Sequence, residues 1–598
     1  MKRHSKLLSL VLSLAMLMAF AMPIMAAPPD DGSITITAPA SLGLAAGDFK
    51  AYQLFTVKTI SPNGANTAII YELVPAVAPF LAQTSQQGKY GAAAGVAPTP
   101  AQFLTWLQGQ TSDSAAMIAL AKELTIWNET AEAITAIPAA QIDDNTVKFG
   151  NTTRLALGYY LVTGAGQYTD DTDDPKHAND SNGGVHDGKV FSRSMLFSIP
   201  RFNTTGNVLE YDVGCTLKAD APQIDKQVWY HGDQDPNTKT PADGGTWTNE
   251  TDVNIGNTVY FKLESKVPDM TGYETYQFIV HDYMSKGLTF DDSGATAYDK
   301  VKVTIGGVTV NGTNLGGLTY TVTTNTSDAG LTGEYEDGTY IKIEFDRTKF
   351  VNLDKDDPIV ITYSAELNEE AIIGNPGNPN KVKLQYSNNP NKTGTGTTAE
   401  TPEHEVRVHT FKLEIFKFTG SQVALPGAQF ELRVGSKTGA KVSVVPDGSG
   451  VAGRYRLVTS EDVAADALLA PGSKKITTTL VSGADGKIII KGLDAGTYFL
   501  EETLPPPGYN GLVGGWVTNI VIARNSDKTT PGGGYSMTIE GEPENTVNVE
   551  NNTGGLLPGT GGIGTYIFYG IGIAMAILLA AAFIIYRRRK TLGALDAA

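Results

Sequence analysis

Hydrophobic and polar residues alternate with a period of two along most of this chain. Residues 33–37 read Ser-Ile-Thr-Ile-Thr, and similar alternating runs recur at 259–263, 340–345, 411–418 and 546–550. Successive side chains of a β-strand point to opposite faces, so this period predicts strands with one buried face. Glycine, asparagine and aspartate separate the runs, as they do in turns. The pattern therefore predicts a mainly β protein.

Two segments in the first third of the chain have helical spacing instead, at 100–107 and 114–126. In the second segment apolar residues recur one helical turn apart, at Met117, Leu120, Ala121 and Leu124. This spacing predicts helices within an otherwise β region.

Strand runs separated by turn residues divide the chain into three regions, 28–217, 218–402 and 403–553. Regularly spaced short strands are typical of β-sandwiches. We therefore expect three Ig-like β-sandwich domains in series, with a few helices in the N-terminal one.

Two longer apolar runs lie near the ends of the chain. Basic residues precede an apolar run at 7–20, and small residues follow at Ala26 and Ala27, so residues 1–26 are expected to be a secretory signal peptide. The run 563–586 is about 24 residues long, enough to span a bilayer as a helix. Four basic residues open the tail 587–598 and predict that it stays cytoplasmic.

The composition of the chain excludes several classes of binding partner and of catalytic or metal site. The formal net charge of -17 argues against nucleic acid and anionic lipid as partners. The seven histidines and one cysteine form no metal-ligand spacing, and GxSxG, HExxH and P-loop motifs are absent from the sequence. We therefore expect no enzyme acting on an external substrate, no metal and no cofactor. The Asp/Asn/Gly-rich segment 170–188 is interpreted as a solvated loop, with calcium binding left open.

Cysteine usage excludes disulfides within the chain. An exported protein has access to disulfides, yet this one contains only Cys215. That residue is expected to be small and buried, with an intermolecular bridge left open. Any covalent staple inside these domains must have another chemistry.

The C-terminal run is preceded by a short motif: Leu557, Pro558, Gly559, Thr560 and Gly561. Motif, apolar run and basic tail together resemble the LPxTG cell-wall sorting signal of Gram-positive bacteria. The resemblance implies that a sortase cleaves after Thr560 and transfers it to peptidoglycan or to another subunit. The protein would then span the membrane only as a precursor.

The third region contains Leu-Pro-Gly-Ala-Gln-Phe-Glu-Leu at 425–432 and Thr-Tyr-Phe-Leu-Glu-Glu-Thr at 497–503, followed by Pro-Gly-Tyr at 507–509. These motifs resemble those of the Cna-B modules of Gram-positive pilins. Such modules form an internal Lys–Asn isopeptide bond assisted by a glutamate. Carried onto this chain, the residues are Lys417, Asn551 and Glu502. Glu501 and Asn552 remain the alternatives.

Strand parity agrees with this assignment. Lys417 shares a strand face with Leu413 and Ile415, and Asn551 and Glu502 end similar apolar rows. Burial disfavours the charged amine and raises the pKa of a carboxyl group. A neutral lysine could then attack the asparagine amide while the acid moves protons, and ammonia would leave.

The second region resembles the middle domain of major pilins, in the stretch 221–229 and in 380–390. The resemblance implies a second bond from Lys226, which shares a strand face with Ile224 and Val228. Asn388 is the predicted acceptor and Asp282 the predicted acid. Asn380 has the same parity as Asn388 and stays open.

Major pilins are polymerised by sortase through a lysine near the junction of the first two domains. At this place the chain has Thr-Leu-Lys-Ala at 216–219, a poor match to the family's Tyr-Pro-Lys-Asn motif. Lys218 is the candidate. The resemblance implies a structural shaft subunit of a covalent pilus on the cell surface, with sortase, neighbouring subunits and peptidoglycan as partners and host ligands left open. The alternative is a monomeric wall-anchored adhesin that never polymerises.

Overall fold

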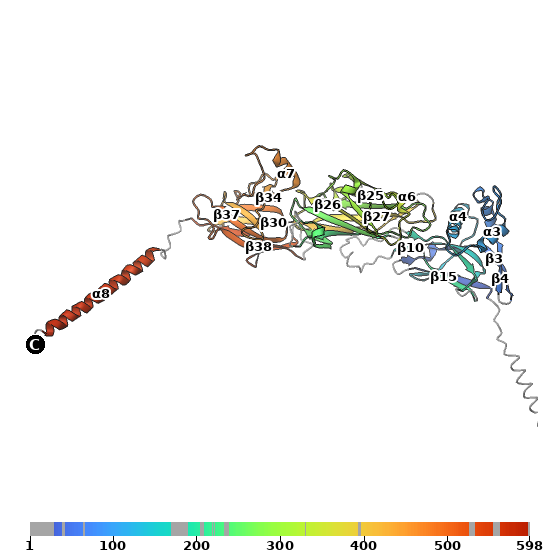
Figure 1. The fold of residues 1–598 in the computed structure, drawn as a ribbon, viewed down its shortest axis with the longest axis horizontal. Coiled ribbons are helices and arrows are strands. Elements are labelled where there is room, and N and C mark those ends of the chain that lie inside the picture. Colours follow the sequence, from blue (N-terminus) through green and yellow to red (C-terminus); the bar gives the residue numbers. More distant parts are fainter. Residues whose placement is uncertain are drawn as a thin grey trace, which may run out of the picture.

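Three β-sheet domains follow one another along the long axis of the molecule, and a long helix lies at the C-terminal end (Figure 1). The computed structural model describes residues 29–38, 42–63, 66–168, 189–203, 208–217, 219–220, 222–232, 239–328, 330–392, 396–525, 533–553 and 563–595. The expected mainly β fold with several sheet domains is confirmed.

The first domain combines short sheets with helices. Its sheets have the strand orders β15-β1-β7-β6 with β8 beside β1, β11-β10-β2, β12-β9-β3-β4 with β5 beside β3, and β13-β14. Their bounds are β1 Asp31–Thr37, β2 Leu42–Leu44, β3 Lys50–Asn63, β4 Asn66–Leu73, β5 Ile137–Pro138, β6 Ala140–Asp143, β7 Thr146–Phe149, β8 Leu155–Ala156, β9 Gly158–Thr163, β10 Ala165–Tyr168, β11 Lys189–Phe191, β12 Met195–Ile199, β13 Arg201–Phe202, β14 Leu209–Glu210 and β15 Asp212–Thr216.

The two predicted helices of this domain are present as α3 (Pro100–Gln108) and α4 (Ala115–Ala131). Thr99 caps α3 in a capping box with Gln102, and Ser114 caps α4 by accepting a hydrogen bond from the Met117 amide. The shorter helical segments are η1 Ala46–Asp48, η2 Pro75–Val77, α2 Ala78–Leu81 and η3 Thr84–Gln86. Leu120 and Leu124 of α4 are buried, as their spacing predicts.

The second domain is a sandwich of two sheets of seven strands each. One has the order β17-β16-β19-β26-β22-β23 with β21 beside β26, and the other β18-β29-β27-β20-β25-β24 with β28 beside β27. The elements are β16 Asp225–Tyr230, η4 Pro241–Asp243, β17 Thr246–Thr248, β18 Glu250–Asp252, β19 Thr258–Lys266, β20 Phe278–Met284, β21 Leu288–Phe290, α5 Ala297–Lys300, β22 Lys302–Ile305, β23 Val308–Thr309, β24 Tyr320–Asn325, η5 Gly333–Tyr335, β25 Thr339–Phe345, α6 Arg347–Phe350, β26 Pro358–Leu367, β27 Asn378–Ser387, β28 Thr398–Glu400 and β29 His404–His409.

The third domain is a second sandwich, of two six-stranded sheets. Their orders are β31-β30-β36-β34-β33 with β41 beside β30, and β35-β32-β37-β38-β39-β40. The elements are β30 Phe411–Thr419, β31 Val423–Ala424, β32 Gln429–Val434, β33 Val444–Pro446, β34 Arg454–Leu457, α7 Ser460–Ala467, β35 Leu480–Val481, β36 Lys487–Leu493, β37 Gly496–Leu504, β38 Trp516–Arg524, β39 Tyr535–Ile539, β40 Glu542–Glu544 and β41 Val547–Glu550.

Sheet pairing moves the predicted boundary between the second and third domains by one strand. The prediction begins the third domain at 403, yet β29 pairs with β27 and β18 of the second domain. The third sandwich therefore begins with β30. Alternation marks both segments as strands but does not say which sheet each one joins.

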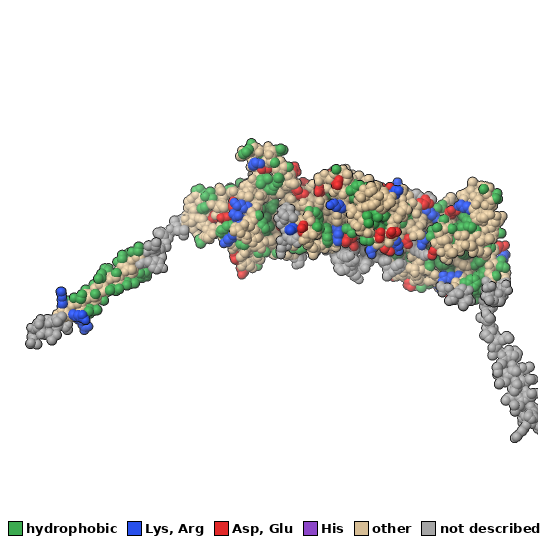
Figure 2. Space-filling view, viewed as in Figure 1, with side chains coloured by type: hydrophobic (Ala, Val, Ile, Leu, Met, Phe, Trp, Pro, Cys, Tyr) green, Lys and Arg blue, Asp and Glu red, His purple; other side chains and the backbone are tan. Residues whose placement is uncertain are grey.

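The C-terminal apolar run forms α8 (Ile563–Leu595). In the described part of the chain this is the one helix long and apolar enough to cross a membrane, over Ile567–Arg589 with a mean hydropathy of 2.5. Its apolar side chains are uncovered and basic side chains lie near its end (Figure 2). These features agree with the predicted membrane-spanning segment.

Polar side chains join the first domain to the second. The side-chain amide of Asn388 donates a hydrogen bond to the backbone carbonyl of Lys189 at 2.7 Å. The backbone carbonyl of Asn388 accepts one from the backbone amide of Phe191. Asn391 donates to the Ser192 carbonyl at 2.9 Å. Hydrogen bonds of Asn388 and Asn391 therefore connect the second domain to the first.

The second and third domains make a close backbone contact. The Ile255 amide donates to the Gly492 carbonyl at 2.9 Å. Gly492 has a φ of 93°, and a Cβ there would lie 2.6 Å from a side-chain carbon of Ile255. Only glycine permits both the backbone conformation and the approach.

Candidate functional site

Two buried lysines, one in each sandwich, are the chemically distinctive feature of the described chain. Lys226 lies on β16 and Lys417 on β30, and both have no exposed surface. An isolated ammonium group is costly to bury, so each lysine needs polar partners. Each has a carboxylic acid and an asparagine beside it.

The Lys226 site lies between the two sheets of the second domain. Lys226 projects from the β16 sheet, while Asp282 on β20 and Asn380 on β27 belong to the opposite sheet. Lys226 Nζ is 2.5 Å from Asp282 Oδ2 and 2.6 Å from Asn380 Oδ1. The site therefore places a nucleophile, an acid and an amide in direct contact.

A fourth residue, Tyr363 on β26, completes this network. Its hydroxyl accepts a hydrogen bond from Lys226 Nζ at 2.7 Å and donates one to Asp282 Oδ2 at 2.6 Å. It also accepts one from Asn380 Nδ2 at 3.2 Å. Tyr363 was not among the site residues predicted from the sequence. Its signal was its parity, since it shares the buried face of β26 with Ile361 and Ala365.

Burial shapes the electrostatics of the site. Desolvation lowers the pKa of Lys226 to about 8, although the nearby Asp282 opposes the shift. Desolvation also raises the pKa of Asp282, against the opposing effect of Lys226. Both shifts favour passing a proton from the ammonium to the carboxylate, which leaves a neutral amine beside the Asn380 amide.

The structure corrects the predicted asparagine of this site. Asn388, the predicted acceptor, lies at the junction with the first domain, where it contacts Lys189 and accepts a hydrogen bond from Thr397. Asn380, which the sequence left open, contacts Lys226 instead. The two asparagines share a strand parity, but eight residues of extended strand separate them by roughly 26 Å. Parity identifies the face of a strand and not the height along it.

The Lys417 site has the same residue types in another arrangement. Lys417 lies on β30 and Asn551 directly follows β41, and these two strands are parallel neighbours in one sheet. Glu502 reaches them from β37 in the opposite sheet. The predicted residues Lys417, Glu502 and Asn551 thus come together.

In this second site the acid contacts both partners directly. Glu502 Oε1 is 3.3 Å from Lys417 Nζ and accepts a hydrogen bond from Asn551 Nδ2 at 2.8 Å. Glu502 Oε2 accepts one from the Leu512 amide at 2.5 Å. Burial lowers the pKa of Lys417, and Glu502 opposes that shift. Asn551 Oδ1 is buried without a hydrogen-bond partner among the described residues.

The alternatives for this site point away from it. Glu501 faces outward and pairs with Arg433 at 3.4 Å, and its side chain is 30% exposed. Asn552 is exposed. Parity therefore selected the correct face at both positions.

Both sites can carry out the same reaction. A neutral lysine Nζ can attack the asparagine Cγ, an amide bond forms, and the amide nitrogen leaves as ammonia once it gains a proton. The acid can hold and return that proton. Among the described residues, no group of three or more histidine, cysteine or acidic side chains could hold a metal ion.

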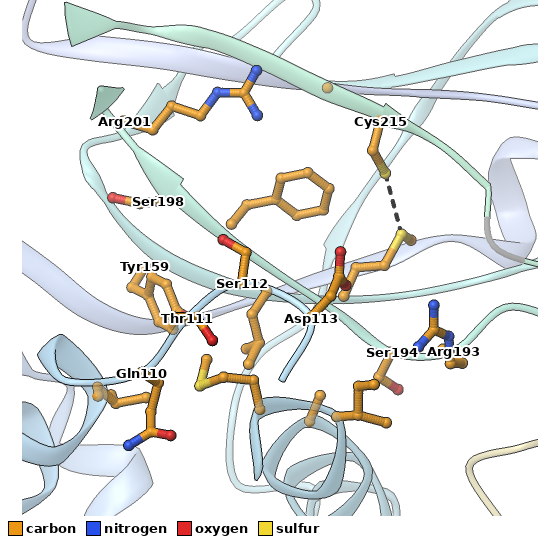
Figure 3. A pocket seen from close by; sticks show the side chains of 18 residues that line it. Gln110, Thr111, Ser112, Asp113, Tyr159, Arg193, Ser194, Ser198, Arg201 and Cys215 are labelled. Carbon is orange, nitrogen blue, oxygen red and sulfur yellow. Dashed lines mark hydrogen bonds between the residues drawn. The ribbon is translucent and has the colours of Figure 1, made fainter. Parts of the chain in front are cut away.

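Several predicted features lie outside the described residues. They are residues 1–26, the segment 170–188, Lys218, and the motif Leu557, Pro558, Gly559, Thr560 and Gly561. Cys215 is described, and it is half-buried rather than buried. Its thiol lies 3.4 Å from the Met195 sulfur (Figure 3).

Cys215 lines a cavity of about 370 Å³ in the first domain, between the α3–α4 connection and strands β12 and β15. Asp113, Arg193, Arg201 and several hydroxyl groups surround this cavity (Figure 3). It includes none of the residues of the two lysine sites.

Two family models match parts of the chain. Residues 255–390 match the Gram-positive pilin backbone subunit 2, Cna-B-like domain, and residues 411–530 match a prealbumin-like fold domain. The chain is also similar to the trypsin-resistant surface T6 protein of Streptococcus pyogenes. The two are 25% identical over 457 residues, which cover 68% of this chain and 78% of that protein.

Solved structures of similar proteins include the T6 backbone pilin of S. pyogenes, with a TM-score of 0.45 and 16% identity over 88% of this chain and 100% of that one. The full-length major pilin SpaD of Corynebacterium diphtheriae has a TM-score of 0.41 and 18% identity, over 88% of this chain and 98% of that one.

Proposed function

The chain belongs to the backbone pilins of Gram-positive bacteria, and we propose that it forms a covalently joined shaft whose subunits are each reinforced by two self-made Lys–Asn isopeptide bonds. A backbone pilin is a structural, cell-surface subunit that assembles with other pilin subunits. The proposal adds how the subunit is strengthened, joined and anchored.

The observation that carries the proposal is the pair of buried Lys–acid–Asn sets. Each lies inside a sandwich with the lysine nitrogen within 3.3 Å of a carboxylate oxygen. The asparagine amide of each set is hydrogen-bonded within that network. A stabilising ion pair would not require an asparagine. A buried ion pair also often stabilises the fold no more than apolar residues of similar size would. A reaction between lysine and asparagine accounts for all three residue types.

The bonds would be Lys226–Asn380, with Asp282 as the acid, and Lys417–Asn551, with Glu502 as the acid. The reaction is a single turnover of the protein on itself and needs no cofactor. Intact mass of the full chain tests it, because each bond removes one ammonia. Two missing ammonia molecules and branched tryptic peptides at both lysines are expected, whereas linear peptides around Lys226 and Lys417 would refute the bonds.

Assembly and anchoring by sortase rest on sequence features. Sortase would join Thr560 of one subunit to a lysine of the next, for which Lys218 is the candidate, and would attach the finished shaft to peptidoglycan. Host adhesion would be supported by the shaft. A surface extract run under denaturing and reducing conditions should give a ladder, and Lys218→Arg should collapse it to a single band. A single band from the unchanged protein would favour the monomeric adhesin instead.

A further inference from the structure

The two lysine sites differ in how the acid reaches the asparagine. In the third domain Glu502 Oε1 accepts a hydrogen bond directly from Asn551 Nδ2 at 2.8 Å. In the second domain the acid is one methylene shorter. Among the described residues, Asp282 hydrogen-bonds to Lys226 and Tyr363 but not to Asn380.

The Tyr363 hydroxyl fills this gap. It lies 2.6 Å from Asp282 Oδ2 and 3.2 Å from Asn380 Nδ2, the nitrogen that must leave. From these contacts we propose that Tyr363 is a catalytic residue of the second domain, relaying the Asp282 proton to the Asn380 amide nitrogen. This role rests on the proposed isopeptide bond and adds a fourth member to its machinery.

The proton balance of the step is closed. Lys226 first gives one proton to Asp282, so that both become neutral. Nζ then attacks Asn380 Cγ, the Tyr363 hydroxyl proton passes to Nδ2, and Asp282 replaces it on the tyrosine oxygen. The Cγ–Nδ2 bond breaks and ammonia leaves, while the second Nζ proton returns to Asp282. Each proton lost by one group is gained by another, and no further reactant is needed.

The surroundings suit a relay through a neutral tyrosine. Tyr363 is 6% exposed, and its ring stacks on Phe261 with centroids 5.4 Å apart. Lys226 Nζ lies 5.5 Å from the centre of the Tyr363 ring, which favours the cation before the proton moves. Burial raises the pKa of Tyr363 well above its ordinary value, so the hydroxyl must gain a proton as it gives one away.

The first test is Tyr363→Phe in the full chain, which keeps the ring and removes the hydroxyl. Bond formation at Lys226 should slow by about 100-fold, the lower end of the range for losing a general acid–base group. Mass over time after synthesis measures this, and the Lys417 bond in the same molecule is an internal control. Tyr320→Phe is the matched control, because it removes a buried hydroxyl that donates to the Val301 carbonyl, outside the site.

A second variant tests the reach of the acid. Asp282→Glu combined with Tyr363→Phe exchanges a hydroxyl for a methylene in the same space, and the longer acid should contact Asn380 directly. The proposal predicts that the tyrosine substitution costs much less in the glutamate background than in the aspartate background. Equal cost in both backgrounds, or a normal rate in Tyr363→Phe, would overturn it.

A third readout separates chemistry from packing and does not depend on removing the hydroxyl. A fluorinated tyrosine at 363 keeps the shape of the site but acidifies the phenol. A relay predicts that the rate and its pH profile shift with the acidity of the phenol, and an unchanged profile would contradict it. If the unchanged protein itself has a linear peptide at Lys226, the isopeptide bond fails, whatever the variants do.

Discussion

The second and third domains hold the same three residue types in two geometries. In the third domain, lysine and asparagine belong to neighbouring parallel strands of one sheet, and a glutamate reaches across from the other. In the second domain, lysine faces an aspartate and an asparagine from the opposite sheet, and a tyrosine hydroxyl bridges them. The proposed reaction would therefore tolerate different strand arrangements, provided that water is excluded and a proton path connects acid and amide.

The difference has a mechanical consequence. A Lys417–Asn551 bond would tie together the first and last strands of the third domain within one sheet. A Lys226–Asn380 bond would instead staple the two sheets of the second domain to each other. Either bond would hold its strands together against unfolding better than hydrogen bonds do, since each hydrogen bond contributes roughly 1 kcal/mol net to stability.

The largest expected effect comes from removing the nucleophiles. Lys226→Met and Lys417→Met keep the apolar stem of the side chain and should each abolish one ammonia loss. Each closed loop spans more than 100 residues of sequence, so by analogy with disulfides each substitution should lower the free energy of unfolding by roughly 4–5 kcal/mol. Intact mass and thermal denaturation measure both effects. A Met variant that still loses two ammonia molecules would remove that lysine from the scheme.

Shortening the acid of the third domain tests whether reach separates the two sites. Glu502→Asp should slow the Lys417 bond by about 100-fold or more, since among the described residues no tyrosine hydroxyl forms a hydrogen bond with Glu502. The rate of ammonia loss measures this, with Glu501→Asp on the outward face as control. An unchanged rate would show that acid length is not what distinguishes the sites.

The two asparagines of β27 and its extension should separate bond formation from domain docking. Asn380→Ala should abolish the Lys226 bond. Asn388→Ala should keep the bond but weaken the contact with the first domain by about 1–2 kcal/mol, because the Lys189 carbonyl loses its donor. Intact mass shows which variant has lost the Lys226 bond, and limited proteolysis measures how accessible the junction with the first domain has become. Loss of the Lys226 bond in Asn388→Ala would instead show that Asn388 is the acceptor.

The smallest effect is expected at the junction of the second and third domains, where His231 Nε2 lies 3.1 Å from Asp494 Oδ2. Burial opposes protonation of His231, but the hydrogen bonds to Asp494 and to the Asp252 carbonyl, together with the charges of both aspartates, outweigh it and raise the pKa of His231 to about 9. Burial raises the pKa of Asp494 to about 8, although His231 opposes the rise. Both folded-state pKa values exceed the unfolded ones, so stability at this junction falls as pH rises, and the histidine contribution is lost through about pH 9.

Limited proteolysis between the two domains should therefore be a few-fold faster at about pH 10 than at about pH 7. His231→Gln should remove the part of this pH dependence that is lost through about pH 9 and keep the part due to Asp494, while leaving both ammonia losses intact. Equal cleavage at the two pH values in the unchanged protein would contradict this account.

The local sequence pattern was enough to predict most of the secondary structure and which faces of the strands are buried. Period-two alternation predicted the strands, and the spacing of Leu120 and Leu124 predicted a helix. Parity placed Lys226, Lys417 and Glu502 on buried faces, because the face of a strand residue depends only on its position in the alternation. The length of the C-terminal run likewise predicted the long apolar helix that the structure contains.

Tertiary structure alone decided which buried groups meet. Asn380 and Asn388 are equivalent by parity, and only the register of β27 against β20 distinguishes them: it pairs Asn380 with Met284, two residues from Asp282 on the same strand. Tyr363 enters the site from a strand far away in sequence, and β29 joins the second sandwich although its pattern equally suits the third. Contacts between sheets depend on the register and packing of whole domains, and alternation along a single strand carries no information about either.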